Sequence, residues 1–344
     1  MLEIKREGII LESSGSDFDL EGVLNPAIIQ KGNKVYMIYR ALARNRKSSL
    51  GFCELNGPLN IISVSTEPIL YPEYENEIAG IEDPRIVYLE DRYYLSYTAY
   101  DGVNALGALA ISNNLKSFKK FGLITPQIHY QTFLKEVSIS GPLNEKYNRY
   151  NKRESIRVKN QKQVYLWMKN IVFFPKRIDN KIHFLIRIKP DIQLVSIDKI
   201  EDLTPEFWKN YFNTFHSHII LEPLYGHEVS YIGGGCPPIE TDSGWLIIYH
   251  GVCDSPEGYV YSICASLLDL TFPFKEKYRL PFPILTPSVE YELKGEINNV
   301  CFPTGSAQFD GKLYIYYGAA DKRIACISMN LNLLIEELLK NPKV

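Results

Sequence analysis

One pattern occurs five times along this chain of 344 residues. In each copy a proline lies in or beside a short apolar run, a polar turn follows, and an aromatic-rich run comes back. The prolines are Pro26, Pro84, Pro175, Pro238 and Pro303. Self-similarity at an interval of about 60 residues, with one longer interval, is typical of a repeat architecture in which each copy is one supersecondary unit.

The residues inside each copy have the composition of β-strands. In the second copy, residues 82–87 precede the turn Glu90-Asp91, and the returning run 93–100 contains four tyrosines. A third run of the same kind follows in every copy, at 49–53, 107–112, 192–196, 261–266 and 323–328. Short runs rich in tyrosine, isoleucine and valine between turn residues indicate strands.

Four-stranded units repeated at this interval predict an all-β fold, a five-bladed β-propeller with few short helices. A two-sheet sandwich would not require the same order of proline, turn and aromatic strand five times. The sequence shows no linker and no shift in composition, so we expect residues 1–344 to form a single domain.

The longer interval holds an insertion at about residues 126–165, rich in charge and asparagine. We expect a surface loop or an oligomer contact, and a substrate lid is the alternative. Helices are predicted at only two places. Thr204-Pro205-Glu206 is a helix start before 207–212, and the apolar residues of 331–339 have helical spacing.

Charge and hydropathy exclude several partners. Lysine plus arginine number 38 and aspartate plus glutamate 40, which gives a net charge of −2. A nearly neutral chain without a basic block lacks the electrostatic footprint of a nucleic-acid-binding protein. No apolar run approaches the roughly 18 residues that cross a bilayer, and the first residues lack an apolar signal segment. We expect no nucleic-acid or membrane partner and a cytoplasmic location, and leave a homo-oligomer open.

The six cysteines are scattered and form no C-x-x-C pair. We expect buried free thiols, which is the ordinary state of cysteine in a reducing compartment. The six histidines do not cluster with them, and a zinc site needs clustered ligands. The sequence therefore predicts neither a metal site nor another cofactor.

Polar residues at strand ends are the candidates for a site, because the inner strands of a propeller converge on one central channel. The sharpest group is Glu82-Asp83-Pro84-Arg85, in which a proline holds the backbone between two carboxylates and a guanidinium. It could be a turn with Arg85 paired to a neighbouring carboxylate. It could also hold an acid close to a glycosidic oxygen, as sugar cleavage requires.

A set of motifs spread over nearly the whole chain identifies a family. They are Asn25-Pro26-Ala27, Tyr39-Arg40-Ala41, 80–85, 97–100, Phe174-Pro175, Arg187, 232–239, 244–246, 249–252, 267–270, 299–305 and 316–321. With them the sequence resembles glycoside hydrolase family 130, the mannoside phosphorylases and mannosidases built on five-bladed propellers.

The resemblance implies roles for individual residues. Asp83 would be the catalytic acid, passing its proton through the mannose 3-hydroxyl to the glycosidic oxygen, with inversion and without a covalent intermediate. The residues expected to bind a mannose-containing oligosaccharide are Asn25, Arg40, Glu82, Arg85, Tyr100, Asp101, Tyr261 and Asp321.

The family divides by nucleophile, and the residues here depart from the phosphorylase pattern. Phosphorylases place an arginine where this chain has Lys169 and a lysine where it has Tyr231, whereas Arg187 and His250 match. A dianion needs such compensating positive charge.

Two further carboxylates, Glu228 and Glu257, could activate water as general bases. They could equally be surface loop residues beside an altered phosphate site. We therefore expect an inverting β-mannosidase acting on β-1,2-linked manno-oligosaccharides. The alternative is a β-1,2- or β-1,4-mannoside phosphorylase that uses phosphate as co-substrate and releases mannose 1-phosphate.

A third possibility is a carbohydrate-binding propeller without catalysis, because fold alone does not decide function. Asp83 together with His250 argues against it, since a protein that only binds sugar needs no proton donor.

Overall fold

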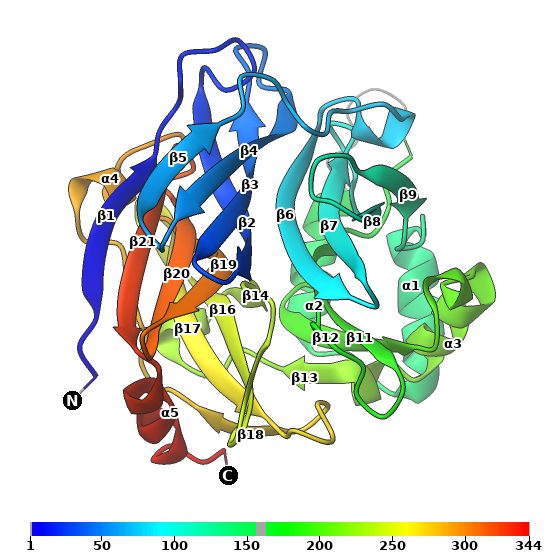
Figure 1. Cartoon of the computed structure of the whole chain (residues 1–344). Coiled ribbons are helices and arrows are strands. Elements are labelled where there is room, and N and C mark those ends of the chain that lie inside the picture. Colours follow the sequence, from blue (N-terminus) through cyan, green and yellow to red (C-terminus); the bar gives the residue numbers. More distant parts are fainter. Residues whose placement is uncertain (1, 156–162, 344) are drawn as a thin grey trace.

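The computed structural model describes residues 2–155 and 163–343. The chain is mostly β, with antiparallel strands in several sheets (Figure 1). The strands form five units that follow one another in sequence, and the expectation of a mostly β protein is confirmed. Unit 1 contains β2 (Gly22–Lys31), β3 (Lys34–Leu42), β4 (Ser48–Asn56) and β5 (Asn60–Val64). Unit 2 contains β6 (Gly80–Leu89), β7 (Arg92–Tyr100), β8 (Ala105–Ser112) and β9 (Lys119–Leu123).

The remaining units repeat the order of the first two. Unit 3 contains β10 (Lys169–Phe173), β11 (Ile182–Ile188), β12 (Asp191–Ile197) and β13 (Ile219–Leu221). Unit 4 contains β14 (Tyr231–Gly234), β15 (Ile239–Thr241), β16 (Gly244–Ser255), β17 (Gly258–Leu268) and β18 (Glu276–Arg279). Unit 5 contains β19 (Cys301–Phe309), β20 (Lys312–Ala319), β21 (Arg323–Asn330) and β1 (Lys5–Leu11).

Two strand pairings connect different parts of the chain: one joins units 1 and 2, and the other joins the first strand to the last. Units 1 and 2 share a sheet only through one parallel bridge, between Ser48 and Gly80. Strand β1 pairs antiparallel with β21, so the first strand of the chain completes the sheet formed by the last three. This pairing ties the two ends of the chain together (Figure 1).

The predicted strands match the structure except around two prolines. In unit 3 the first strand, β10, ends at Phe173, before Pro175 and not across it as expected. In unit 4 the prolines at 237 and 238 lie between β14 and β15, both of which pair with β16. Proline has no N–H to donate to a ladder, and the strand is interrupted at these two places. Pro26, Pro84 and Pro303 lie within β2, β6 and β19, at register shifts.

Both predicted helices are present. Helix α3 (Pro205–Asn213) begins where expected, and the Thr204 side chain accepts a hydrogen bond from the backbone N–H of Phe207. Helix α5 (Leu331–Leu339) is capped in the same way by Asn330. One further helix, α4 (Glu290–Leu293), and the 3-10 turns η1 (Glu75–Glu77), η3 (Ile200–Asp202), η4 (Phe215–His218) and η5 (Gly226–Glu228) were not predicted.

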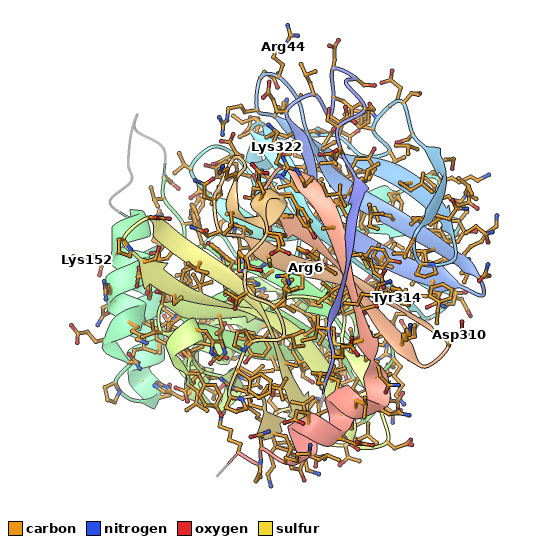
Figure 2. The ribbon with its side chains drawn as sticks, turned by 90° about the vertical axis from the view of Figure 1, so that its left-hand side faces the viewer. Arg6, Arg44, Lys152, Asp310, Tyr314 and Lys322 are labelled. Atoms are coloured by element: carbon orange, nitrogen blue, oxygen red, sulfur yellow. The ribbon has the colours of Figure 1, made fainter. Side chains whose placement is uncertain are left out.

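Most of the described part of the insertion is helical, and the expectation of a loop is wrong for these residues. It contains α1 (Tyr130–Val137), η2 (Ser138–Ser140) and α2 (Glu145–Ser155). Phe133 of α1 packs edge-on against Phe212 and Phe215, so α1 lies beside α3 (Figure 1). Figure 2 shows Lys152 on the outward side of α2. The part of the insertion at 156–162 lies outside the described residues.

Tyr147 anchors α2 to unit 3. Its hydroxyl donates a 2.5 Å hydrogen bond to the Asp191 carboxylate and accepts one of 3.0 Å from the Gln193 side chain. Both partners belong to β12, and all three side chains are buried. The insertion is therefore docked through polar as well as aromatic contacts.

All six cysteines are free, and five of them are buried, as expected. Among the described helices, none is both long enough and apolar enough to cross a membrane.

Candidate active site

The first strands of units 1, 2 and 3 are interrupted at the same point. Asn25, Asp83 and Asn170 have positive φ angles of 51°, 50° and 56°, and each falls in a register shift of its strand pair. Asparagine and aspartate tolerate this left-handed conformation better than most residues. In units 1 and 2 a proline follows directly, at Pro26 and Pro84, and stiffens the bend. The bulge points equivalent side chains of successive units toward one centre.

A cavity of about 860 Å³ lies at this centre, and every unit contributes to its lining. The structure brings ten of the predicted site residues together there. They are Asn25, Arg40, Glu82, Asp83, Tyr100, Lys169, Arg187, Tyr231, Tyr261 and Asp321.

Acidic side chains of units 2 and 5 line the cavity together with Asn25 and Arg40 of unit 1. Asn25 Nδ2 donates a 2.7 Å hydrogen bond to Asp83 Oδ1. Arg40 lies between the carboxylates, with Nη2 2.7 Å from Glu82 Oε1 and Nη1 3.5 Å from Asp83 Oδ1. This cation allows two neighbouring carboxylates to share a confined space.

The pKa values of the two aspartates move in opposite directions. Burial acts to raise the pKa of Asp83, but the charges of Arg40 and Lys169 and the Asn25 hydrogen bond outweigh it, so that pKa lies below its ordinary value. Burial raises the pKa of Asp321 to about 6, and the charges of Asp83 and Glu82 add to the rise. In the free protein near neutral pH, Asp83 is ionised.

Cationic side chains form the other side. Lys169 and Arg187 are directly opposite on β10 and β11. Arg187 Nη1 lies 3.5 Å from His250 Nε2 and donates to it. Burial, followed by the charges of Arg187, Arg85, Lys169 and Lys189, lowers the pKa of His250 far below its ordinary value. The imidazole is therefore neutral, fully buried and beside the cations without lining the cavity.

Buried polar atoms without a hydrogen-bond partner gather around this cavity. Among the described residues they include Asn25 Oδ1, both polar side-chain atoms of Asn170, Arg187 Nε and His250 Nδ1. Most buried polar groups in proteins are paired, so such a cluster is a feature of a binding site.

Arg85 and Asp101, which were predicted to bind substrate, do not line the cavity. Arg85 is buried, and its guanidinium donates to the backbone carbonyls of Asp83 (2.8 Å), Gly234 (3.2 Å) and Gly235 (2.7 Å). It braces the backbone that presents Asp83. Asp101 lies in the β7–β8 turn, where it accepts from the backbone N–H of Asn104 at 2.6 Å.

Glu228 does not reach the cavity either. It is fully buried, and one carboxylate oxygen accepts a short hydrogen bond from the Tyr249 hydroxyl. The other oxygen accepts from Arg279 Nη1 at 3.0 Å and from the backbone N–H of Leu224 at 2.9 Å. Every strong acceptor position of this carboxylate is in use, and a general base must be able to take a proton from water.

The same arrangement occurs at other junctions between units. Glu77 accepts from the Tyr97 hydroxyl (2.7 Å), from Lys120 Nζ (2.6 Å) and from the backbone N–H of Glu73 (3.0 Å). A third copy consists of Glu292, Tyr317, Arg6 and the backbone N–H of Ser288. Glu228 is therefore one copy of a repeated structural contact that caps a short helical turn and ties it to the next strand.

Glu257 is exposed in the tight turn between β16 and β17, where its backbone N–H donates to Ser255 Oγ at 3.2 Å. It does not line the cavity. Neither of the two predicted general bases, Glu228 and Glu257, therefore lines the cavity.

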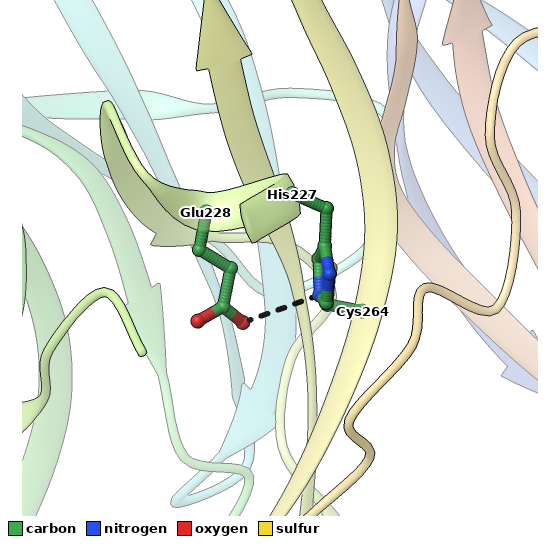
Figure 3. Close-up of side chains that lie close together, drawn as sticks. All are labelled: His227, Glu228 and Cys264. Atoms are coloured by element: carbon green, nitrogen blue, oxygen red, sulfur yellow. Dashed lines mark ion pairs between the residues drawn. The ribbon is translucent and has the colours of Figure 1, made fainter. Parts of the chain in front are cut away.

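Glu228 also belongs to a cluster with His227 and Cys264, whose ligand atoms lie within 4.8 Å of one another (Figure 3). His227 Nε2 is 3.7 Å from Glu228 Oε1. A cation there would compete with the Arg279 guanidinium for the same carboxylate. Burial raises the pKa of Cys264 well above its ordinary value, so the thiol is protonated. Since the Glu228 carboxylate is already paired with Arg279, we assign no metal to this cluster.

Among the lining residues that were not predicted are Trp167, Lys189, Tyr259 and Phe302. Two of them carried a signal in the sequence. Lys189 follows Arg187 by two residues and Tyr259 precedes Tyr261 by two, and extended chain places such pairs on one face. Trp167 and Phe302 enter through contacts between units, which no local pattern reveals.

Known proteins resemble this chain over nearly its whole length. A family model for glycoside hydrolase family 130, described as beta-1,4-mannooligosaccharide phosphorylase, matches residues 14–340. A 1,2-beta-oligomannan phosphorylase of Thermoanaerobacter sp. (strain X514) is 30% identical over 337 residues, which cover 93% of this chain and 95% of that protein.

Two solved structures share the fold. A beta-1,2-mannobiose phosphorylase from Listeria innocua, in complex with beta-1,2-mannobiose, has a TM-score of 0.72 at 20% identity, covering 98% of this chain and 100% of that one. A second structure, described as belonging to family-130 glycoside hydrolases that target beta-1,2 mannosidic linkages in Candida mannan, has a TM-score of 0.72 at 20% identity, covering 96% and 94%. At this identity the likeness concerns the fold.

Proposed function

This chain belongs to glycoside hydrolase family 130, and from that premise we propose that it is a phosphorylase that cleaves β-1,2-linked mannosides. The sequence favoured a hydrolase. A sequence match over 93% of the chain and the geometry both support the alternative, because the matched relative is a phosphorylase and because Glu228 and Glu257 do not line the cavity.

The observation that carries the proposal is the cationic side of the cavity. Lys169 and Arg187 lie opposite each other on β10 and β11, and both line the same cavity as the carboxylates of Asp83 and Asp321. A dianion taken out of water needs compensating charge and charge-assisted hydrogen bonds. Arg187 Nε, which lacks a partner among the described residues, adds a donor on this side.

The reaction then has a balanced form. An oxygen of hydrogen phosphate bonds to the anomeric carbon while the bond from that carbon to the leaving oxygen breaks. Asp83 supplies the proton that the leaving oxygen takes up, through the mannose 3-hydroxyl as the family resemblance implies. The phosphate loses its own proton once it is esterified, and this proton restores Asp83. Mannoside plus hydrogen phosphate gives mannose 1-phosphate plus a shortened sugar.

The pKa of Asp83 links phosphate binding to catalysis. In the free protein the charge of Lys169 helps to hold that pKa low, so the acid has no proton to give. A phosphate dianion beside Lys169 offsets this charge, which raises the pKa of Asp83. Phosphate binding therefore favours the protonated form of the acid.

The linkage is a separate part of the proposal. The matched relative is named for 1,2-beta-oligomannan, whereas the family model is described by a beta-1,4 activity. Incubation with β-1,2- and β-1,4-mannobiose, each with and without phosphate, separates the cases. We expect mannose 1-phosphate from the β-1,2 substrate in the presence of phosphate. Equal release of free mannose under both conditions would indicate the hydrolase, for which the neutral Tyr231 on the cationic side is the favouring observation.

The architecture and location complete the proposal. Because every unit contributes to the cavity lining, we propose that the five units are the blades of a β-propeller around it, in a single catalytic domain of residues 1–344. A cytoplasmic location remains a prediction from the sequence.

A further inference from the structure

We propose that Lys189 is the third cation of the phosphate-binding wall and sets the affinity for the anion. The proposal rests on the phosphorylase function proposed above and extends it to a residue to which neither the motifs nor the sequence comparison assigns a role. It also gives a purpose to Tyr231, a neutral side chain in the middle of a cationic wall.

Lys189 is placed by the strand that carries Arg187. β11 ends at Ile188, and Lys189 follows directly. Lys189 lies in the turn between β11 and β12, and both Arg187 and Lys189 line the cavity.

The aromatic ring of Tyr231 holds the two cations against one wall. Lys189 Nζ lies 4.4 Å from the centre of this ring, and Arg187 Cζ lies 5.4 Å from it. The Tyr231 hydroxyl makes a short hydrogen bond with that of Tyr261, which fixes the plane of the ring. Cation–π contacts of this kind stabilise a positive charge without neutralising it. The Tyr231 ring thus positions the Arg187 guanidinium and the Lys189 ammonium.

Helix α2 supports the same ring from behind. Tyr150 packs edge-on against Tyr231 with the ring centres 5.7 Å apart, and Lys189 Nζ is 5.9 Å from the Tyr150 ring. Tyr150, Tyr231 and Val252 form one buried cluster. The insertion therefore contributes to the wall of the site, although its polar outer face points away from it.

Lys189 also acts on the interior of the site. Its charge is among those that lower the pKa of the buried His250, together with Arg187 and Lys169. The fields of these three cations therefore overlap at one point beside the cavity. Like charges repel when gathered in a low-dielectric space, and a bound dianion relieves this repulsion.

The competing explanation is that Lys189 only packs between Tyr231 and Tyr150 and keeps the insertion docked. The two explanations differ in what a loss of charge changes. Lys189→Met keeps most of the aliphatic stem and removes the charge, and Lys189→Arg keeps the charge. Lys176→Met is the matched control, because Lys176 Nζ also lies over an aromatic ring, 5.7 Å from the centre of Trp245, but does not line the cavity.

The experiment measures KM for phosphate and KM for β-1,2-mannobiose separately, together with the rise in melting temperature on adding inorganic phosphate. For Lys189→Met we expect the KM for phosphate to rise at least about tenfold, as loss of a charge-assisted contact predicts. The KM for the mannoside should stay within about twofold, and the stabilisation by phosphate should shrink. Lys189→Arg should restore most of the affinity, and Lys176→Met should resemble the wild type.

Each contrary result identifies what has failed. An unchanged KM for phosphate in Lys189→Met, with an active wild type, would overturn the role of Lys189 and leave the phosphorylase proposal intact. A fall in melting temperature with both KM values raised equally, and no rescue by Lys189→Arg, would assign Lys189 to packing alone. A wild-type enzyme that forms no mannose 1-phosphate would overturn the phosphorylase function itself.

Discussion

The Asn25 amide donates a 2.7 Å hydrogen bond to the Asp83 carboxylate, and the two residues occupy equivalent left-handed bulges in neighbouring units. The Asn25 side chain of unit 1 therefore holds the Asp83 carboxylate of unit 2. The repeated backbone bend thus does more than build the fold, because it brings side chains 58 positions apart in sequence into contact.

Replacement of Asp83 by asparagine tests its role as the acid. The amide that replaces the carboxylate would keep an oxygen that accepts from Asn25 but has no transferable proton. We expect turnover to fall by at least about 100-fold, with a melting temperature close to that of the wild type. An Asp83→Asn enzyme that keeps more than about a twentieth of its activity would remove Asp83 from the acid role.

The structure predicts that substitution of Glu228 lowers stability, whereas substitution of a catalytic base would lower activity. Glu228→Gln removes the charge that faces the buried Arg279. Removing one partner of a buried ion pair costs about 3–5 kcal/mol of the free energy of unfolding. Because Glu276 still pairs with Arg279, we expect a loss of stability at the lower end of this range. Below the melting temperature kcat/KM should stay within about threefold of the wild type.

Glu292→Gln is the matched control for this variant, because Glu292 makes the same set of contacts at another junction. We expect both variants to lose stability and to keep activity. A Glu228→Gln protein with normal stability and greatly reduced turnover would return Glu228 to a catalytic role. Thermal unfolding and initial rates at one low temperature measure both quantities.

Asp321 makes the stability of the protein depend on pH. Its pKa is about 6 in the folded protein, above the ordinary value of 3.8. A folded-state pKa above the unfolded one means that ionising Asp321 opposes folding. This penalty is absent below pH 4, grows between pH 4 and 6 and is complete above pH 6.

Asp321→Asn should therefore raise the melting temperature at pH 7.5, by the equivalent of about 3 kcal/mol, and by only about a third of that at pH 4.5. Activity should fall, because the residue lines the cavity. Equal shifts at both pH values would show that the buried charge is not the cause.

Tyr147→Phe tests how the insertion is held. The change removes the hydroxyl that donates to Asp191 and accepts from Gln193. The buried Asp191 carboxylate loses this donor, whereas Gln193 keeps its two hydrogen bonds to the Ile188 backbone. Such a loss costs about 1–3 kcal/mol. We expect a lower melting temperature and faster proteolytic cleavage within α2. Cleavage at the wild-type rate would mean that the aromatic contacts of α1 alone dock the insertion.

The parts of the site that the sequence predicted are those that depend on local pattern. Asp83 was predictable because Pro84 follows it and the same bend recurs at Asn25. Glu228 was misplaced because its burial depends on Arg279, 51 residues away. The same holds for Lys189, whose importance comes from the ring of Tyr231 on another strand.

The helices of the insertion were missed for a related reason. α2 is strongly polar, and the few apolar side chains that dock it, such as Tyr147 and Tyr150, look unremarkable outside the fold. The repeated strands, in contrast, show the same sequence pattern in every copy. Five copies of one pattern are thus predictable where a single inserted segment is not.

The most direct test of the central claim is a ³¹P NMR time course with β-1,2-mannobiose at increasing concentrations of inorganic phosphate. The account predicts that a mannose 1-phosphate signal grows at a rate that saturates with phosphate, and that sugar cleavage stops when phosphate is removed. Release of free mannose at the same rate without phosphate would contradict it.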